Sequence, residues 1–143
     1  YDPSRNADGS LEFAVTASST SGVPLEWGLM LSAADDTHSS AGSSSSLDNG
    51  ASTSSGAAGY LQIIDINSGT PTVKITDSTD DSSFSDLIAF TAVANGNEPS
   101  FERKTVSGTV NRYVKITTTG TFSNCKFIVG FRRGESTDDV AYS

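Results

Sequence analysis

The sequence has little of the side-chain chemistry on which enzymes and disulfide-bonded domains depend. Its 143 residues include one cysteine, Cys125, and one histidine, His38. A lone cysteine excludes a disulfide within the chain. Cys125 lies in "CKFIVGF", where it shares strand spacing with Phe127 and Phe131, so we expect it to be a small buried hydrophobe. The alternative, a thiol nucleophile, would need a nearby base, and His38 is the one imidazole that could serve.

The sequence also lacks long apolar runs and an excess of positive charge. No stretch approaches the roughly 20 apolar residues that span a bilayer, and none has the pattern of a signal peptide. Nine lysines and arginines face seventeen aspartates and glutamates, which gives a formal net charge of −8. Because this surplus repels phosphate backbones and anionic lipids, we expect neither nucleic acid nor membrane as a partner. Two interpretations of the surplus stay open: simple solubility, and attraction of cations or basic partners.

Serine, threonine, glycine and alternating apolar residues are what the sequence does contain. Hydrophobic residues make up 35% of the chain, which predicts a thin core under a polar surface and suits a two-layer β architecture. In "TVKITD", Val73 and Ile75 are expected to face inward. The intervening Lys74 and Thr76 are expected to face outward. The segment "YLQIIDI", residues 60–66, is apolar on both parities, which predicts a central strand covered on both faces.

Such patterns recur along the chain with turn signals between them, and no segment shows sustained helical periodicity. About eight strands are expected, so the predicted fold is all-β, an antiparallel β-sandwich that is jelly-roll-like. The last two predicted strands, "TVNRYVKITTTG" and "TFSNCKFIVGFRRG", are separated by little more than Thr-Gly-Thr, and we expect them to pair as a hairpin. Further half-buried strands are predicted at "SLEFAVTA" and at "LEWGLMLS", whose apolar face contains Leu25, Trp27, Leu29 and Leu31.

Composition divides the chain into three parts. Residues 1–9 are predicted to be a linker or lead-in, residues 10–133 the sandwich, and residues 134–143 a polar tail that is free or bound to a partner. Within the sandwich, residues 32–59 are rich in serine and glycine and predict a long loop with one short strand near Leu47. Loops of this length are functional, disordered, or ordered only against a neighbouring subunit.

An acidic cluster of Asp77, Asp80, Asp81 and Asp86 marks the middle of the chain, "GTPTVKITDSTDDSSFSDLIAF". Asp80, Asp81 and Asp86 are the candidate metal ligands, because carboxylate oxygens could form a loose calcium site. The stretch from Asp77 to Asp86 has neither the glycine nor the closing glutamate of an EF-hand loop. The favoured interpretation is a hairpin tip in which Asp and Ser side chains bond their own backbone, so we expect no metal there.

No constellation of residues predicts catalysis. Asp35, Asp36 and His38 could be metal ligands, but a serine-rich loop gives them no fixed geometry and no surrounding groups to orient them. The many serines include no G-x-S-x-G elbow, so a Ser–His–Asp hydrolase is not expected. We expect neither enzymatic activity nor a cofactor.

Two basic spots are candidate interaction sites. In "VNRYVKI", which resembles a strand of galactose-binding-like sandwiches, Arg112 has the same parity as Val114. We expect Arg112 to point partly inward and to pair with a carboxylate of the Asp77–Asp86 turn. In "GFRRG", Arg132 and Arg133 close the last strand. They suit a subunit interface of alternating sign, with a solvated strand end as the alternative.

Longer stretches resemble a known family. "GYLQIIDINSGTPTVKITDSTDDSSFSDLIAFTAV" and "ERKTVSGTVNRYVKITTTGTFSNCKFIVGFRR" resemble a β-sandwich domain of tailed-bacteriophage virion proteins, and "DGSLEFAVTASSTSGVPLEWGLMLS" extends the likeness to roughly residues 8–133. The likeness is to the C-terminal sandwich of major tail proteins, which follows another module. The start at Tyr1 rather than Met fits such a position, and we expect a processed product, a fragment or the ordered part of a longer protein.

The resemblance implies a structural component of a virion, namely a tail (tube-associated) subunit or a surface-decorating domain. Its partners would be other copies of itself and other virion proteins. It supplies no catalytic residue. A capsid decoration protein with the same sandwich is one alternative.

A second alternative is a carbohydrate-binding module for host-surface glycans, because the topology also resembles such modules. Sugar-binding platforms need exposed, coplanar aromatic rings. The aromatic candidates occur in strand patterns that equally suit burial; they are Trp27, Tyr60, Tyr113 and Phe131.

Overall fold

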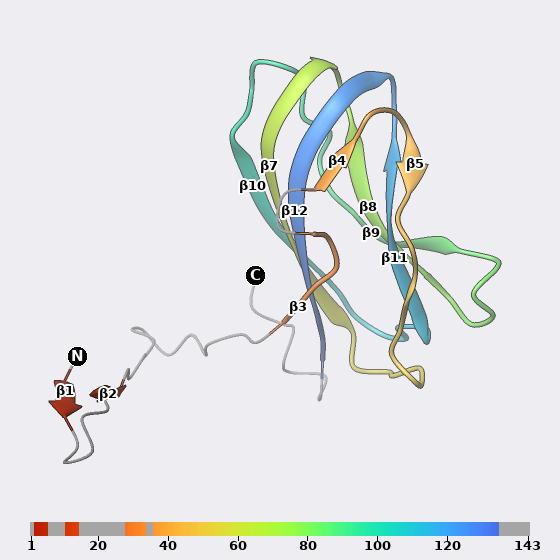
Figure 1. The fold of residues 1–143 in the computed structure, drawn as a ribbon. Helices are drawn as coiled ribbons and strands as arrows, with labels where there is room; N and C mark the ends of the chain where they lie inside the picture. Colours follow the sequence, from red (N-terminus) through yellow and green to blue (C-terminus); the bar gives the residue numbers. More distant parts are fainter. Residues whose placement is uncertain (1, 6–10, 15–27, 34–35, 135–143) are drawn as a thin grey trace.

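The structure, a computed structural model, describes residues 2–5, 11–14, 28–33 and 36–134. Every regular secondary-structure element in these residues is a β-strand. Ten of the strands form two antiparallel sheets that pack face to face (Figure 1). The predicted all-β antiparallel sandwich is therefore confirmed, with about ten strands in place of about eight.

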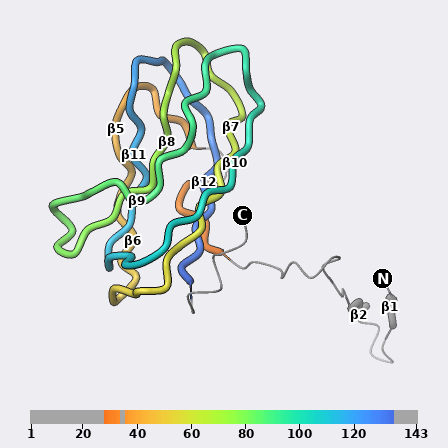
Figure 2. Tube along the Cα trace, turned by 180° about the vertical axis from the view of Figure 1, so that it is seen from behind, coloured from red at the N-terminus to blue at the C-terminus, as the bar shows by residue number. Residues whose placement is uncertain are grey.

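Each sheet of the sandwich contains five strands. Sheet I has the order β10 (Ser100–Val106), β7 (Ala57–Gly69), β12 (Phe122–Arg133) and β3 (Leu29–Met30), and β4 (Asp36–His38) also pairs with β12. Sheet II has the order β5 (Gly42–Ser43), β11 (Tyr113–Thr119), β8 (Thr72–Ser78) and β9 (Ser85–Ala89), and β6 (Leu47–Asp48) also pairs with β11. Figure 2 shows the opposite side, where β8 and β9 run into a hairpin that projects from the sandwich.

The start of the chain differs from the prediction. Residues 1–9, expected to be a linker, contain β1 (Asp2–Arg5), which pairs with β2 (Leu11–Ala14) in a separate two-stranded sheet. The predicted strand at "SLEFAVTA" therefore exists at β2, but β2 is not part of either sheet of the sandwich. Within the described residues the sandwich begins at β3, and Leu25 and Trp27 lie outside those residues.

The core lies between the two sheets and follows the period-two pattern of the sequence. Phe127, Val129 and Phe131 of β12 are fully buried, as are Val73 and Ile75 of β8, whose inward positions are confirmed. Side chains at alternate positions of a strand point to the same face, so one run of alternating apolar residues supplies one wall of the core.

Strand β7 is apolar on both parities because it contains a β-bulge. Ile63 and Asp65 pair with two consecutive residues of β12, which leaves Ile64 as an extra residue. The alternation then resumes one residue out of step, so Ile66 is buried as Ile63 is. Gln62 and Asp65 are exposed, and the prediction of a strand covered on both faces is wrong.

Two of the places where the chain crosses between the sheets are neighbouring arches. β7 of sheet I leads into β8 of sheet II through Thr70 and Pro71, and β11 of sheet II leads into β12 of sheet I through Gly120 and Thr121. The last two strands therefore belong to different sheets, and the prediction that they form a hairpin is wrong. The Thr70 N–H donates to the carbonyl of Thr121 at 3.0 Å, which ties the two arches together.

Each arch requires a glycine. Gly69 and Gly120 have φ angles of +89° and +97°, in the left-handed region that L side chains rarely adopt. A Cβ atom on Gly69 would lie 2.1 Å from the carbonyl oxygen of Thr121, and one on Gly120 would lie 2.5 Å from that of Thr70. The arches approach so closely that neither has room for a side chain.

The described residues of the serine-rich segment 32–59, which are 32, 33 and 36–59, are more ordered than predicted. The short strand expected near Leu47 is confirmed as β6, but β4 pairs with sheet I and β5 with sheet II, so the segment passes from one sheet to the other. Hydroxyl groups supply much of its bonding. The Thr118 Oγ1 atom lies 2.7 Å from Nδ1 of His38 and accepts a hydrogen bond from the Gly42 N–H at 3.2 Å. Hydrogen bonds to a sheet therefore order a segment that has little apolar surface to bury.

Candidate functional site

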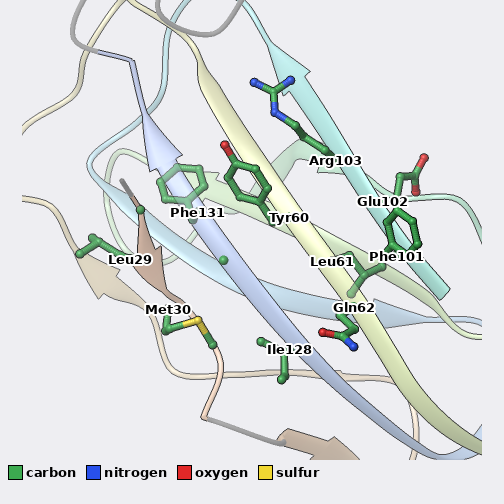
Figure 3. A pocket seen from close by; sticks show the side chains of 12 residues that line it. Leu29, Met30, Tyr60, Leu61, Gln62, Phe101, Glu102, Arg103, Ile128 and Phe131 are labelled. Atoms are coloured by element: carbon green, nitrogen blue, oxygen red, sulfur yellow. The ribbon is translucent and has the colours of Figure 1, made fainter. Parts of the chain in front are cut away.

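The candidate site is a groove on the outer face of sheet I, the face that points away from the core. It has a volume of about 450 Å³ and runs across β10, β7, β12 and β3 (Figure 3). We call it the sheet I groove. The side chains that matter for its chemistry come from all four strands: Met30, Tyr60, Gln62, Phe101, Arg103 and Ile128.

Strand register aligns these side chains in two rows. Arg103, Tyr60 and Met30 occupy one row, with Gly130 between Tyr60 and Met30. A second row consists of Phe101, Gln62 and Ile128. Both rows face outward because the residues between them on each strand, such as Leu61 and Val129, belong to the core.

Gly130 helps to keep the groove open. It lies in the middle of β12, where a side chain would normally stand beside its cross-strand neighbours. A Cβ atom added there would come within 3.6 Å of two side-chain atoms of Tyr60. The absence of a side chain at Gly130 therefore leaves space next to the Tyr60 ring.

Exposed apolar side chains border the groove. Phe101 is 89% exposed, Met30 is 56% exposed and Leu29 is 54% exposed. The expectation that Leu29 lies in the core is therefore wrong, whereas Leu31 is partly buried against the core. Phe101 also borders a second hollow of about 390 Å³. An aromatic side chain as exposed as that of Phe101 contributes little to folding. An exposed apolar patch commonly marks a binding site.

Polar groups at the groove are held in defined positions. The Arg103 guanidinium lies over the Tyr60 ring, 5.8 Å from its centroid. Glu102 accepts hydrogen bonds from the N–H of Thr91 at 2.7 Å and from its hydroxyl at 2.9 Å, and pairs with Lys104 at 3.2 Å. These bonds outweigh the effect of burial and lower the pKa of Glu102. The Glu102 carboxylate thus joins β10 to Thr91, which lies just after the end of β9.

The mid-chain acidic residues form the predicted hairpin between β8 and β9, and their carboxylates have separate partners. Asp77 accepts a hydrogen bond from the N–H of Asn111 at 2.7 Å. Asp86 pairs with Lys74 at 2.7 Å. Asp81 is exposed at the tip with a φ angle of +58°.

Asp80 organises the hairpin tip. Its Oδ1 atom accepts hydrogen bonds from the N–H groups of Ser82 and Ser83, at 2.9 and 2.8 Å, and from the Ser78 hydroxyl at 2.8 Å. These donors lower the pKa of Asp80 from its ordinary 3.8 to about 2. Among the described residues, no three His, Cys, Asp or Glu side chains are grouped so that they could hold a metal ion.

Arg112 has a different partner from the one predicted. Its Nε and Nη2 atoms donate to the two carboxylate oxygens of Asp48, both at 2.7 Å, and its guanidinium lies 5.0 Å from the centroid of the Tyr113 ring. The expected pairing with the Asp77–Asp86 turn is therefore wrong. The Arg112 hydrogen bonds, with one from the Gly50 N–H, lower the pKa of Asp48 from 3.8 to about 2. The pair joins β6 to the start of β11.

Arg132 and Arg133 diverge at the end of β12. Arg133 donates to the carbonyls of Ala51 and Val110, at 2.7 and 3.3 Å, and to the hydroxyl of Thr53 at 3.2 Å. Burial lowers the pKa of Arg133. Arg133 therefore joins the end of β12 to residues 51–53 and to Val110, and is not part of a solvated strand end. Arg132 lies at an outward register position opposite Ala58, on the same face as the groove.

The remaining chemical candidates do not line the groove or lie outside the described residues. His38 contacts the Phe127 ring edge-on, with 5.0 Å between ring centroids. Cys125 is fully buried, as predicted, and its burial raises the pKa of the thiol to about 11. Asp35 lies outside the described residues, so the expectation that it forms no metal site with Asp36 and His38 stays a prediction.

The groove was missed by the sequence predictions, although one signal for it existed. Phe101 is the single aromatic residue of "SFERK", and it has the same parity as Arg103, which alternation places on the polar face of that strand. A large aromatic side chain on a polar face is a signal for a binding surface. Of the predicted aromatics, Tyr60 borders the groove and Phe131 is fully buried.

Comparisons with known proteins identify no family for this chain. No protein-family model matches it, and no curated protein matches it significantly. In the part of the chain that the structure describes, no helix has the length and hydropathy needed to cross a membrane.

Proposed function

We propose that this chain is a structural subunit of a tailed-bacteriophage virion, acting through contacts between subunits. Within the virion it would be a tail (tube-associated) subunit or a surface-decorating domain. The sequence resemblance to virion β-sandwich domains supports this proposal, and so does the sandwich itself. The observation that carries most weight is the exposed apolar groove on sheet I, because a surface of this kind suits contact with another protein.

The placement of the polar groups supports the same proposal. Asp48 with Arg112, Asp80 with its serines, and Arg133 with the 51–53 segment all fasten one strand or turn to another. Groups of this kind stabilise a building block. A catalytic role would instead need a nucleophile, a base and a space for substrate brought together, and the described residues form no such group.

Immunogold electron microscopy tests the proposal. An antibody raised against the chain should label purified particles of the phage that encodes it. Label along the tail supports the tail assignment, and label on the head supports the capsid decoration alternative. Particles that stay unlabelled, while the antibody detects the free protein in the same lysate, would contradict a virion role.

Binding of host-surface glycans is a second candidate function, and the exposed Phe101 ring is the observation that favours it. Aromatic faces stack on sugar rings, and Gln62 and Arg103 could donate hydrogen bonds beside that ring. A glycan array probed with the native chain and with Phe101→Ala tests it. Signals that Phe101→Ala abolishes would support glycan binding, and an array without signals would remove this candidate.

A further inference from the structure

The sheet I groove has the composition of a protein–protein contact. Met30, Ile128 and Phe101 offer apolar atoms, and Tyr60 with Arg103 adds two of the three residue types that are enriched at binding hot spots. The cores of protein interfaces are enriched in aromatic residues, Met and Arg. A groove with this much aliphatic surface matches protein side chains better than it matches hydroxyl-covered sugars.

Charge restricts which surface can enter the groove. Among the described residues, three basic side chains lie at outward register positions of sheet I, those of Arg103, Lys126 and Arg132, and Asp65 opposite Lys126 is the one acidic residue at an outward position of β7. Glu102, which also lines the groove, pairs with Lys104. The described residues of this face therefore carry a surplus of positive charge, on a chain whose formal net charge is −8. Two such faces packed against each other would bring like charges together, so an acidic partner surface is favoured.

The same chain presents an acidic surface of suitable shape. The β8–β9 hairpin projects from the sandwich in both views (Figures 1 and 2), and residues 79–83 at its tip are exposed. The tip carries the carboxylates of Asp80 and Asp81. At its base, the Lys115 ammonium lies 3.7 Å from the centroid of the Phe84 ring. Because Asp80 already bonds Ser78, Ser82 and Ser83, ordering the tip on binding would cost little conformational entropy.

We propose that the acidic tip of the β8–β9 hairpin of one copy binds in the sheet I groove of the next copy. The inference rests on the proposed structural function and names the contact that would serve it. The hairpin extends from sheet II and the groove lies on the outer face of sheet I, so the two surfaces of one copy point away from each other. The contact is therefore heterologous, and it repeats head to tail into a ring or a filament.

Cross-linking between single-cysteine variants tests the contact directly. Ser82→Cys places a thiol on the hairpin tip and Gln62→Cys places one in the groove; native Cys125 is fully buried and does not compete. A short bifunctional thiol cross-linker should join the two variants when they are mixed, and neither variant alone. Ser107→Cys, an exposed serine outside the hairpin, is the matched control and should not link to Gln62→Cys. Absence of a cross-link in the mixture, or efficient linking of Gln62→Cys to itself, would overturn the proposal.

Sedimentation velocity on concentrated protein supplies an independent readout. Phe101→Ser in the groove and Asp81→Asn at the tip should each weaken self-association about tenfold. Asn is chosen because it tolerates the left-handed backbone at position 81. Mixing the two variants should restore dimers, since each retains the surface that the other has lost. Unchanged association in both variants, or loss of a glycan-array signal in Phe101→Ser with association intact, would refute the contact. Neither result would bear on whether virions carry the chain, which immunogold labelling decides.

Discussion

Individual glycines permit the two tight arches at which this chain changes sheets. Gly69 and Gly120 combine a left-handed backbone with a backbone carbonyl of the opposite arch where Cβ would be. Strain and steric exclusion therefore act at the same two positions. Gly108 also has a positive φ, of +90°, but a Cβ atom there would have nothing within 4 Å. Comparing these positions separates the two effects.

We expect Gly120→Ala to lower the free energy of unfolding by on the order of 3 kcal/mol, because the new methyl group forces the arches apart in addition to straining φ. Gly108→Ala should cost only about 1 kcal/mol, from backbone strain alone. Urea denaturation followed by fluorescence measures both. Equal losses in the two variants would show that the arches are not tightly packed.

Phe101 and Phe127 make a second residue-scale comparison, because one is 89% exposed and the other fully buried. Phe101→Ala should change the free energy of unfolding by less than about 0.5 kcal/mol. Phe127→Ala should cost about 3–5 kcal/mol, since it opens a cavity in the core. Thermal denaturation of both variants checks this. A large loss of stability in Phe101→Ala would mean that the ring serves the fold and is not available for binding.

At the scale of single elements, the bulge in β7 maintains the inward direction of its apolar residues. Without Ile64, the sequence on either side alternates regularly, with Ile63 and Ile66 inward and Asp65 outward. In a strand that pairs without a bulge, such as β11 with β8, removing one residue would turn the following side chains to the wrong face. The bulge is thus a one-residue insertion that the pairing of β7 with β12 accommodates.

Deletion of Ile64 should therefore leave the protein folded, with a loss of no more than about 3 kcal/mol from its half-buried side chain. Deletion of Lys115 from β11, which pairs with β8 without a bulge, is the matched control, and it should prevent folding because Val114 and Ile116 could no longer both face the core. Circular dichroism and proton NMR dispersion distinguish the two outcomes. If both deletions fold, or if neither does, the assignment of the bulge is incorrect.

The Asp48–Arg112 pair holds β6 on β11 and gives this element a pH dependence. Because the pKa of Asp48 is lowered from 3.8 to about 2 in the folded state, its contribution is complete above pH about 4 and is lost as the pH falls toward 2. Asp48→Asn should reduce the loss of stability over that interval. Arg112→Gln should do the same, and the double variant should add nothing further. Urea midpoints measured from pH 6 to pH 2 test this, and additive effects would contradict a direct pair.

Sequence alternation predicted the elements well where one face is simply buried, as in Val73 and Ile75. It failed where backbone irregularity changes the parity, as at Ile64, and where a short connection leads to the other sheet, as at Gly120. A three-residue link fits a hairpin and an arch equally well, and only packing against the second arch decides between them. The groove could not be predicted as a unit because its two rows combine residues from four strands. No local stretch of sequence shows how those strands align with one another.

At the scale of the whole molecule, composition is a poor guide to which segments are ordered, and it does not show where the charges lie. Residues 36–56 bury little apolar surface, yet they are ordered because their backbone and hydroxyl groups bond to β11 and β12. Charge is unevenly distributed among the described residues, with the acidic tip of the β8–β9 hairpin on one side and Arg103, Lys126 and Arg132 on the outer face of sheet I on the other. A chain built this way is suited to repeat itself, and the central proposal is that it does so in a virion.

Quantitative mass spectrometry of gradient-purified phage particles tests that proposal most directly. Peptides of this chain, measured against isotope-labelled standards, should occur in many copies per particle and in a fixed ratio to the major capsid protein from one preparation to the next. Particles that are infectious and intact but contain no peptides of this chain, or only traces that further purification removes, would contradict the account.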